Sequence, residues 1–372
     1  MNIRNAYVFG DTAQFARRDI CVSGQYIIDG SSDGPDIDAT DLYAIPGLID
    51  LHFHGCVGED ISDGSAEGLA KMSEYQASYG VTAICPATVT LPEDVLAKVC
   101  RMASEFEPGS KGASLVGLNL EGPFISPNKT GAQNPAYVGR PDIDMVRRLQ
   151  EASGGLVKLL AIAPEQEGAL DLISALSDDI VCSIAHTTAD YDTAVKATQA
   201  GAKHVTHLYN AMPPFLHREP GVIGAAFDDP DCDVELITDG VHIHPSVVRA
   251  TFSMFGDDRV ILISDSMRAT GLADGLYTLG ELPVRVEGNR ATLVEGGNLA
   301  GSATNLMDCM RTAVKMGIPL ESAVRCATMN PARSLGIEQR YGSLVPGKIA
   351  DIVLLDEDLE IKQIILRGTP LM

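Results

Sequence analysis

The feature that most constrains the fold of this chain is a repeated alternation of short apolar runs with helix-period stretches. Apolar runs expected to be buried strands occupy residues 48–54, 81–87, 115–121, 157–163, 181–186, 204–208, 234–239 and 260–265. Between many of them, apolar residues recur at intervals of three and four, as in residues 65–79, 92–106, 169–176 and 191–200, a pattern typical of amphipathic helices. Eight nearly all-apolar strands with intervening helices predict an α/β protein with a (β/α)8 TIM-like barrel, and an open doubly wound sheet is the alternative.

The two ends of the chain have a different pattern. Short strand-like pieces separated by turn residues occur at residues 26–29, 351–355 and 361–367. We therefore expect residues 1–46 and 346–372 to pair into one small β-sandwich domain, with residues 47–345 forming the barrel. A β-hairpin insert is expected after the eighth strand, at residues 282–294, with Gly288 in its turn.

The charge of the chain narrows its possible partners. The 28 Lys and Arg residues against 50 Asp and Glu give a formal net charge of -22, which disfavours nucleic acid or an anionic membrane as partner. A small phosphorylated substrate stays possible, because charge repulsion is screened within about 8 Å at physiological salt. We find neither a signal-like N-terminal run nor an apolar run of membrane-spanning length, so we expect a cytoplasmic location. The eight cysteines are scattered without a C-x-x-C pair and are expected to be buried, reduced thiols.

A His-x-His pair closes the first expected strand. His52 and His54 are two residues apart, so on a strand their side chains project from the same face. Two neighbouring imidazoles at the end of a strand can hold one divalent cation. Taken alone, the pair could equally be two surface histidines.

Carboxylates and histidines close several further strands. Glu121 ends the third strand in an otherwise apolar run, where an unpaired carboxylate is costly to desolvate and a metal would relieve that cost. His186 ends the fifth strand, His207 the sixth and Asp265 the eighth. Each could be structural by itself, and Glu121 could simply cap a loop. However, all of them fall at the carboxyl ends of barrel strands, where barrel active sites form, and this coincidence favours a metal site.

Three further histidines and one arginine differ in their expected roles. His204 is three residues before His207, so it is expected to point to the opposite side of its strand. His242 and His244 follow the seventh strand; we favour substrate contact for His242 and assign no role to His244. Arg218 lies in a loop that could place its guanidinium over an anion, because the rigid fork of arginine suits phosphate. A surface ion pair is the alternative for Arg218.

At these residues the chain resembles the amidohydrolase superfamily, and within it the deacetylases of phosphorylated amino sugars. The run Thr206-His-Leu-Tyr-Asn-Ala-Met212 followed by Arg218-Glu-Pro-Gly221 is specific to these deacetylases, whereas His-x-His is common to the superfamily. The resemblance covers nearly the whole chain and is carried by residues 46–55, 120–135, 185–188, 204–224, 238–242, 264–271, 299–305 and 342–351.

The resemblance implies metal-dependent removal of the acetyl group from N-acetylglucosamine 6-phosphate or from its galacto epimer. Asp265 would be the catalytic acid and base. The implied metal ligands are His52, His54, Glu121, His186, His207 and Asp265, the principal ones being Glu121, His186 and His207. The implied substrate-binding residues are Ala132, Gln133, Asn210, Ala211, Arg218, His242, Leu299, Ala300 and Gly301. In this family the counterpart of Arg218 reaches the site of the neighbouring subunit, which implies a homodimer.

Two positions vary among members of this family. Members without the His-x-His pair bind one metal, so the presence of the pair here implies that up to two divalent ions bind. The resemblance implies that Glu121 bridges them. Zn²⁺ is the expected metal, and Fe²⁺ or another divalent ion is the alternative. Members with one metal can carry a carbonyl-polarising histidine where this chain has Gln133, which has an N–H donor but no charge. The alternatives are another amidohydrolase reaction, such as nucleobase deamination or cyclic amide opening, and a non-catalytic barrel relative that serves in binding or assembly.

Overall fold

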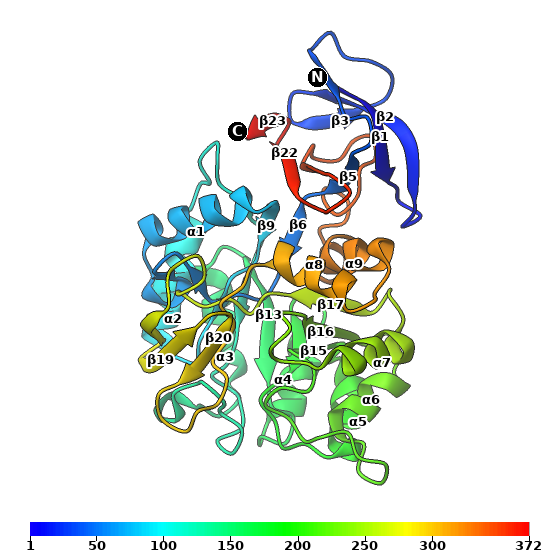
Figure 1. The fold of residues 1–372 in the computed structure, drawn as a ribbon. Helices are drawn as coiled ribbons and strands as arrows, with labels where there is room; N and C mark the ends of the chain where they lie inside the picture. The colour runs from blue at the N-terminus through cyan, green and yellow to red at the C-terminus, as the bar shows by residue number, and fades with distance from the viewer. Residues whose placement is uncertain (372) are drawn as a thin grey trace.

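Seven parallel strands form the centre of the molecule in the computed structural model, which describes residues 1–371 (Figure 1). They are hydrogen-bonded in the order β10-β12-β13-β14-β15-β16-β17 and form a curled sheet, like half of a barrel. Their bounds are β10 Ala87–Thr88, β12 Leu118–Leu120, β13 Val157–Ile162, β14 Val181–Ile184, β15 His204–Val205, β16 Asp233–Ile237 and β17 Val260–Ile263. A second parallel sheet has the order β11-β9-β6, with β11 Ser114–Leu115, β9 Val81–Ile84 and β6 Leu48–Asp50.

Backbone hydrogen bonds outside the ladders connect these two sheets. Ala87 N donates to Phe53 O over 2.7 Å, which places the segment after β6 beside β10. Asp265 N donates to His52 O over 2.9 Å, which places the segment after β17 beside the same segment. The strands of the larger sheet also follow one another in chain order, without the reversal that defines a doubly wound sheet. These observations agree with a barrel-like arrangement.

The strands end earlier than the apolar runs predicted. β6 ends at Asp50 rather than at residue 54, β14 at Ile184 rather than at 186, and β15 at Val205 rather than at 208. Beyond two of these ends the chain stays buried but leaves the ladder, with His186 and His207 at φ values of 41° and 30°. A buried turn has the same apolar composition as a buried strand, so the sequence pattern could not separate the two.

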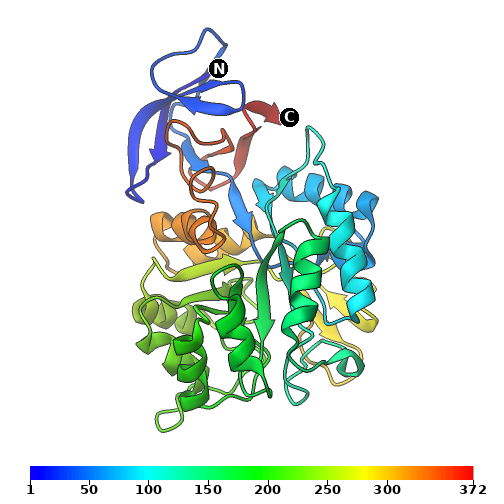
Figure 2. The same cartoon turned by 180° about the vertical axis from the view of Figure 1, so that it is seen from behind.

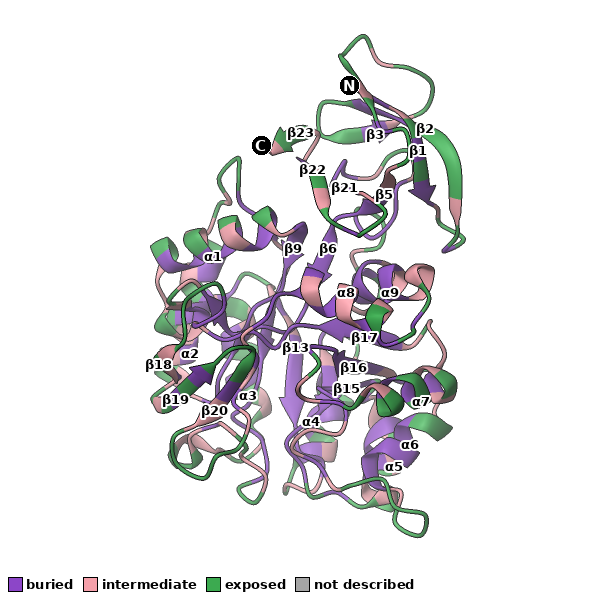
Figure 3. Ribbon diagram, in the orientation of Figure 1, coloured by how far each residue is buried: buried purple, intermediate pink, exposed green. Residues whose placement is uncertain are grey.

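Helices cover the outside of the curled sheet (Figure 2), with their exposed sides facing away from the buried strands (Figure 3). Those matching the predicted helices are α1 Ala66–Ser78, α2 Glu93–Ser104, α4 Ala169–Leu176 and α5 Tyr191–Ala200. The side chains of Ser65 and Asp190 cap α1 and α5 by accepting backbone N–H groups of Gly68 and Thr193, as N-cap residues commonly do. Further helices are α3 Ile143–Ala152, α6 Gly221–Asp228, α7 Pro245–Phe255, α8 Leu306–Lys315, α9 Leu320–Ala327, α10 Met329–Ser334, η1 Ile61–Asp63 and η2 Pro135–Tyr137. Within residues 1–371, the helices are all too short or too polar to cross a membrane.

Strands from both ends of the chain form a separate sheet, which lies at one end of the molecule beside both termini (Figure 1). Its order is β23-β22-β21-β5-β1-β2-β3, and β4 pairs with β1. In β5, Tyr43 and Ala44 pair with β1 in parallel, and the strand also pairs with β21 in antiparallel orientation. Ile3, Val8 and Ile352 belong to one buried apolar cluster. The bounds are β1 Asn2–Phe9, β2 Phe15–Ser23, β3 Tyr26–Ile28, β4 Asp36–Asp38, β5 Tyr43–Pro46, β21 Ile352–Leu355, β22 Ile361–Leu366 and β23 Thr369–Leu371.

The expected hairpin insert is present as part of a larger antiparallel sheet. β19 Leu282–Glu287 and β20 Arg290–Leu293 match the predicted range 282–294. A third strand, β18 Gly275–Leu279, pairs with β19 and was not predicted, because only Leu279 within it is buried and no buried alternating face marks it. A two-stranded pair consists of β7 Gly55–Cys56 and β8 Glu59–Asp60. All eight cysteines lie within the described residues and are buried and unpaired, as predicted.

Candidate metal centre and active site

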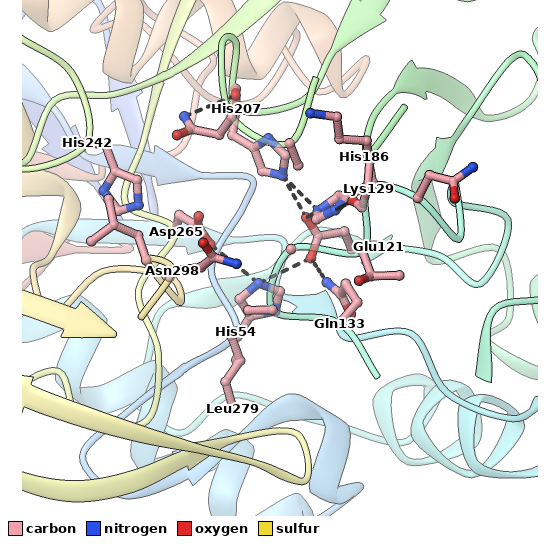
Figure 4. Close-up of a pocket in the computed structure, with 18 residues that line it drawn as sticks. His54, Glu121, Lys129, Gln133, His186, His207, His242, Asp265, Leu279 and Asn298 are labelled. Carbon is pink, nitrogen blue, oxygen red and sulfur yellow. Dashed lines mark hydrogen bonds and ion pairs between the residues drawn. The ribbon is translucent and has the colours of Figure 1, made fainter. Parts of the chain in front are cut away.

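Side chains that can bind metal converge on the floor of a cavity at the carboxyl ends of the parallel strands (Figure 4). They form two groups, and within each group the candidate ligand atoms lie within 4.8 Å of one another. All of these side chains are buried. The first group is Glu121 with His186 and His207, and the second group is His52 with His54 and Asp265. The structure therefore brings together all six predicted ligands.

In the first group, three candidate ligand atoms lie close together. Oε1 of Glu121 lies 3.1 Å from Nε2 of His186 and 3.0 Å from Nε2 of His207, and the two Nε2 atoms are 3.1 Å apart. Nδ1 of His186 faces the carbonyl oxygen of Lys129 at 2.9 Å. Because a carbonyl only accepts, this Nδ1 carries the hydrogen and Nε2 presents its lone pair to the group. A cation between these atoms would balance their facing lone pairs, and the set of two imidazoles and a carboxylate fits a divalent metal.

The second group is more open and shares Glu121 with the first. Nε2 of His54 lies 3.3 Å from Oδ1 of Asp265 and 3.4 Å from Oε2 of Glu121. Nε2 of His52 lies 3.5 Å from Oε1 of Glu121 and 3.9 Å from Oδ1 of Asp265. Nδ1 of His54 faces the carbonyl oxygen of Ala87 at 2.9 Å, while Nε2 of His52 is buried without a hydrogen-bond partner among the described residues. A metal would satisfy this orphaned nitrogen, and the carboxylate of Glu121 contacts side chains of both groups.

The carboxylates make the site favourable for positive charge. Burial alone would lower the pKa of His52, but the charges of Glu235 and Glu121 outweigh it and raise that pKa to about 10. Burial would raise the pKa of Glu121, but the neighbouring His186 outweighs it, and the pKa lies well below its usual range. A site that stabilises an imidazolium and a carboxylate in this way also favours a divalent cation.

Three of the candidate ligands have a strained backbone. His186, His207 and Asp265 follow β14, β15 and β17 with φ values of 41°, 30° and 49°. Residues other than glycine rarely adopt positive φ, and holding them there costs on the order of 1–3 kcal/mol, so such strain concentrates at functional sites. The turns aim these three side chains into the cavity rather than along the strand.

A buried carboxylate that the sequence analysis did not single out lies behind the ligands. Glu235 of β16 has no exposed surface. Its Oε2 lies 2.8 Å from Nδ1 of His52 and accepts the backbone N–H of His207 over 3.0 Å, while Oε1 lies 3.1 Å from Nε2 of His204. His204 thus lies outside both ligand groups, but not through its position on a strand shared with His207, because β15 ends at Val205. The sequence did hold a signal, because Glu235 interrupts an apolar strand in which a carboxylate needs a buried partner.

The cavity above the ligands has a volume of about 510 Å³. The predicted substrate-binding residues that line it are Ala132, Gln133, Asn210, Ala211, His242, Leu299 and Gly301. Ala300 is fully buried behind this wall. Lys129 and Asn298 also line the cavity; they lie in loops, where no periodic pattern marked them.

The imidazole of His242 is held by a carboxylate. Nδ1 of His242 lies 2.8 Å from Oδ2 of Asp239, and the other oxygen of Asp239 accepts the backbone N–H of His242 over 2.9 Å. Burial would lower the pKa of His242, but the hydrogen bond and charge of Asp239 outweigh it and raise the pKa above its ordinary value. The charged form of this ring is therefore more favourable than in an ordinary histidine, and that form attracts an anion.

The side chain of Gln133 is fixed between two partners. Its Oε1 accepts the backbone N–H of Thr90 over 2.6 Å, and its Nε2 donates to Oε2 of Glu121. The amide therefore supports a metal-ligand side chain. Its nitrogen carries a second hydrogen, which is available to another acceptor.

Arg218 lies outside this cavity and borders a separate surface cavity. Its guanidinium contacts Nε2 of His217 at 2.7 Å. In the same loop, Phe215 and Leu216 are 48% and 47% exposed. The chain thus does not place Arg218 in its own site, and the expected role of Arg218 in a neighbouring subunit stays a prediction. His244 caps α7, with its Nδ1 accepting a backbone N–H over 3.2 Å.

A barrel-like parallel sheet whose carboxyl ends carry histidine and carboxylate ligands around one shared glutamate defines a metal-dependent hydrolase. The sequence model of the Amidohydrolase family matches residues 43–371, and the chain belongs to this family. Membership in this family together with the two ligand groups supports a divalent metal as cofactor.

Individual relatives narrow the comparison further. The chain is 39% identical over 334 residues to an N-acetylglucosamine-6-phosphate deacetylase of Bacillus subtilis (strain 168), covering 88% of this chain and 84% of the relative. It is 36% identical to an N-acetylgalactosamine-6-phosphate deacetylase of Escherichia coli O157:H7, covering 87% and 86%. A solved structure of a mutant N-acetyl-D-glucosamine-6-phosphate deacetylase from Mycobacterium smegmatis, in complex with N-acetyl-D-glucosamine-6-phosphate, has a TM-score of 0.91 and 31% identity, covering 100% of this chain and 98% of that one.

Proposed function

We propose that this protein hydrolyses N-acetylglucosamine 6-phosphate to glucosamine 6-phosphate and acetate. The observation that carries the proposal is the pair of ligand groups that share Glu121 on the floor of a cavity lined by Asn210, Ala211 and His242. The names of the similar deacetylases support an amino sugar phosphate as the substrate.

The six side chains of the two ligand groups are proposed to hold one or two divalent ions, with Zn²⁺ as the expected metal because the donors are imidazole nitrogens and carboxylate oxygens. When bound, the metal would polarise the acetyl carbonyl and lower the pKa of a water molecule to about 7. Glu121 contributes to both positions, and Gln133 keeps its carboxylate in place through a hydrogen bond.

Asp265 moves the proton in the proposed reaction. It lines the cavity, and its Oδ1 faces Nε2 of His54 at 3.3 Å. Burial would raise the pKa of Asp265, but the hydrogen bond of His54 and the charge of His52 outweigh it and lower the pKa. Asp265 is therefore ionised at neutral pH and can accept a proton from the attacking water. The proton then passes to the amine nitrogen as the amide C–N bond breaks and the new C–O bond becomes that of acetate.

The phosphate end of the substrate is proposed to bind His242, Asn210 and Ala211, together with Arg218 of the partner subunit. Contacts to this non-reacting end would orient the amide over the ligand groups. Arg218 borders no part of its own cavity, so its proposed contact with the phosphate requires a homodimer. Ala132 and Gln133 would contact the acetyl end, and the turn of Leu299, Ala300 and Gly301 would contact the sugar.

We also propose two features of the architecture. The curled sheet would close as a (β/α)8 barrel of residues 47–345, which the backbone hydrogen bond between Asp265 and His52 supports. The terminal sheet, residues 1–46 and 346–372, would fold on itself as a small β-sandwich around its common apolar cluster. A cytoplasmic location stays a prediction.

An acetate-release assay tests the proposed function. N-acetylglucosamine and N-acetylgalactosamine are each supplied with and without the 6-phosphate, before and after removal of metal with a chelator. We expect release from the phosphorylated gluco compound that is lost on chelation and restored by zinc. The galacto epimer is the second candidate, since one similar deacetylase is named for it. Absence of acetate release from either phosphorylated sugar would refute the proposal.

A further inference from the structure

The ligand histidines differ in what their second ring nitrogen contacts. Nδ1 of His54 and Nδ1 of His186 each face a neutral backbone carbonyl. Nδ1 of His207 is buried without a hydrogen-bond partner within residues 1–371. By contrast, Nδ1 of His52 lies 2.8 Å from Oε2 of Glu235, a fully buried carboxylate. A carboxylate behind a ligand imidazole fixes the tautomer of the ring and raises its basicity.

We propose that Glu235 is a positioning residue that enables the group of His52, His54 and Asp265 to hold a second divalent ion. This inference rests on the proposed metal-dependent function. His52 would donate its Nδ1 hydrogen to Glu235 and present the lone pair of Nε2 to the site. Nε2 of His52 lies 3.5 Å from Glu121 and 3.9 Å from Asp265, so the other ligands constrain this ring little and Glu235 supplies its orientation.

Glu235 also connects the two ligand groups. The Oε2 atom that contacts His52 accepts the backbone N–H of His207, so one oxygen orients a ligand of each group. Oε1 is held by Nε2 of His204 at 3.1 Å, and Nδ1 of His204 lies 3.2 Å from the hydroxyl of Ser334. Protein groups thus fix both oxygens of the carboxylate.

The balance of charge supports the same role. Two divalent ions bring four positive charges, whereas the ligand groups contain two carboxylates, Glu121 and Asp265. Glu235 adds a third negative charge in a buried region, where charges are weakly screened. Because Oε2 of Glu235 lies directly behind the ring of His52, this charge acts mainly on the second position, by raising the basicity of that ring.

Zinc titration of the metal-free, full-length protein tests the proposal. Glu235→Gln keeps the shape and can still accept from His52 and His207, but it removes the charge. We expect the wild type to bind two zinc ions per chain, and Glu235→Gln to bind the second ion roughly 10- to 100-fold more weakly, with the first nearly unchanged. Calorimetry and metal analysis measure both affinities and stoichiometry. Equal affinities in the two proteins would overturn the proposal.

Asp239→Asn is the matched control. Oδ2 of Asp239 lies at the same 2.8 Å from the Nδ1 of a buried histidine, His242, but that histidine belongs to neither ligand group. This variant should keep the zinc affinities of the wild type. A weakening of the second zinc equal to that of Glu235→Gln would indicate a general effect of charge on the site and overturn the positioning role.

Two further variants separate positioning from folding. In a His52→Asn background, Glu235→Gln should weaken the second zinc no further, since its effect passes through His52; a further loss of the same size would overturn the proposal. If Glu235→Gln does not fold, Glu235→Asp replaces it, because aspartate keeps the charge but is one methylene shorter. We expect Glu235→Asp to bind the second zinc more weakly, and wild-type affinity would overturn the proposal.

The wild-type protein distinguishes failure of this inference from failure of the proposed function. A wild type that releases acetate with one zinc bound at saturation overturns the inference alone. A wild type that binds no zinc and releases no acetate refutes the proposed function, and the inference with it.

Discussion

The two ligand groups share Glu121 but are held in different ways. In the first group, the ligand atoms lie 3.0–3.1 Å apart and follow three different strands, β12, β14 and β15. In the second group, the distances from its two histidines to Asp265 and to the shared Glu121 are 3.3–3.9 Å, and both histidines come from one segment after β6. Ligands from separate strands are fixed by the packing of the whole sheet, whereas a His-x-His pair shifts as one unit. The comparison supports a first position that would hold an ion more tightly. In the proposed function, the carboxylate of the second position, Asp265, would also transfer the proton.

Removing the shared ligand should damage both groups, so the largest effect is expected for Glu121→Gln. A variant without metal loses the several kcal/mol by which the metal stabilises the transition state. It also loses the metal-bound water from which Asp265 would take a proton, and this proton transfer contributes about 10²–10⁴-fold to the rate. We expect kcat/KM to fall by at least about 10⁴-fold, together with the zinc content. Metal analysis and acetate release on one sample measure both. Retention of two zinc ions would show that Glu121 is not the bridge.

Asp265→Asn should separate the second group from the first. The amide can still offer an oxygen to a metal but cannot accept the proton, so kcat should fall by about 10²–10⁴-fold while zinc stays in the first group. A base works only when ionised, so wild-type activity falls as pH drops through the pKa of Asp265, which its histidine neighbours lower. That acidic limb should vanish from the residual activity of the variant. With near-normal kcat and metal bound, Asp265 would not be the base and His242 would be the next candidate.

Replacing His52 and His54 together with Asn should remove the second position alone. We expect zinc to fall from two ions per chain towards one, because the first group keeps all three of its side chains. The loss of activity should be smaller than for Asp265→Asn, since the proton acceptor remains. Metal analysis at saturating zinc is the measurement. If the wild type itself never binds more than one ion, the two-ion interpretation is wrong.

Arg218→Ala should leave both ligand groups intact and have the smallest effect. A charge-assisted contact is worth about 1.5–3 kcal/mol, so KM for the phosphorylated sugar should rise roughly tenfold to a hundredfold. Turnover of the unphosphorylated sugar should hardly change, and an equal loss on both substrates would indicate a structural role. Mixing Arg218→Ala with Asp265→Asn subunits should restore some complete sites. Activity no greater than the sum of the two variants would contradict a site shared between subunits.

The sequence predicted which side chains converge at the site more accurately than it predicted the ends of the strands before them. His186, His207 and Asp265 were identifiable because each polar side chain ends a short apolar run, which is a local property of the chain. The ends of the strands depend on which backbone groups find partners in neighbouring strands, and no local pattern records that. β18 was not predicted because most of its residues are half-exposed, so the strand has no buried face that would give an alternating apolar pattern.

The role of Glu235 could not be predicted from the sequence. A carboxylate within the apolar run of β16 needs a buried partner, but that partner, His52, lies 183 residues away along the chain. Only the curled sheet brings β16 opposite the segment after β6. The expected contact of Arg218 also cannot be read from local sequence, because the site that it is expected to reach belongs to a different copy of the chain.

The position of β5 between strands from opposite ends of the chain sets an order of events during synthesis. Tyr43–Pro46 of β5 pair with Ile352–Leu355 of β21. The two strands are about 300 residues apart, so at about 5–20 residues per second this edge of β5 waits about 15–60 s on the ribosome for its partner. Throughout that time the nascent chain carries an unpaired strand edge, which other chains can join. The parallel core can form while translation continues, and the terminal sheet is completed only as the last strands emerge.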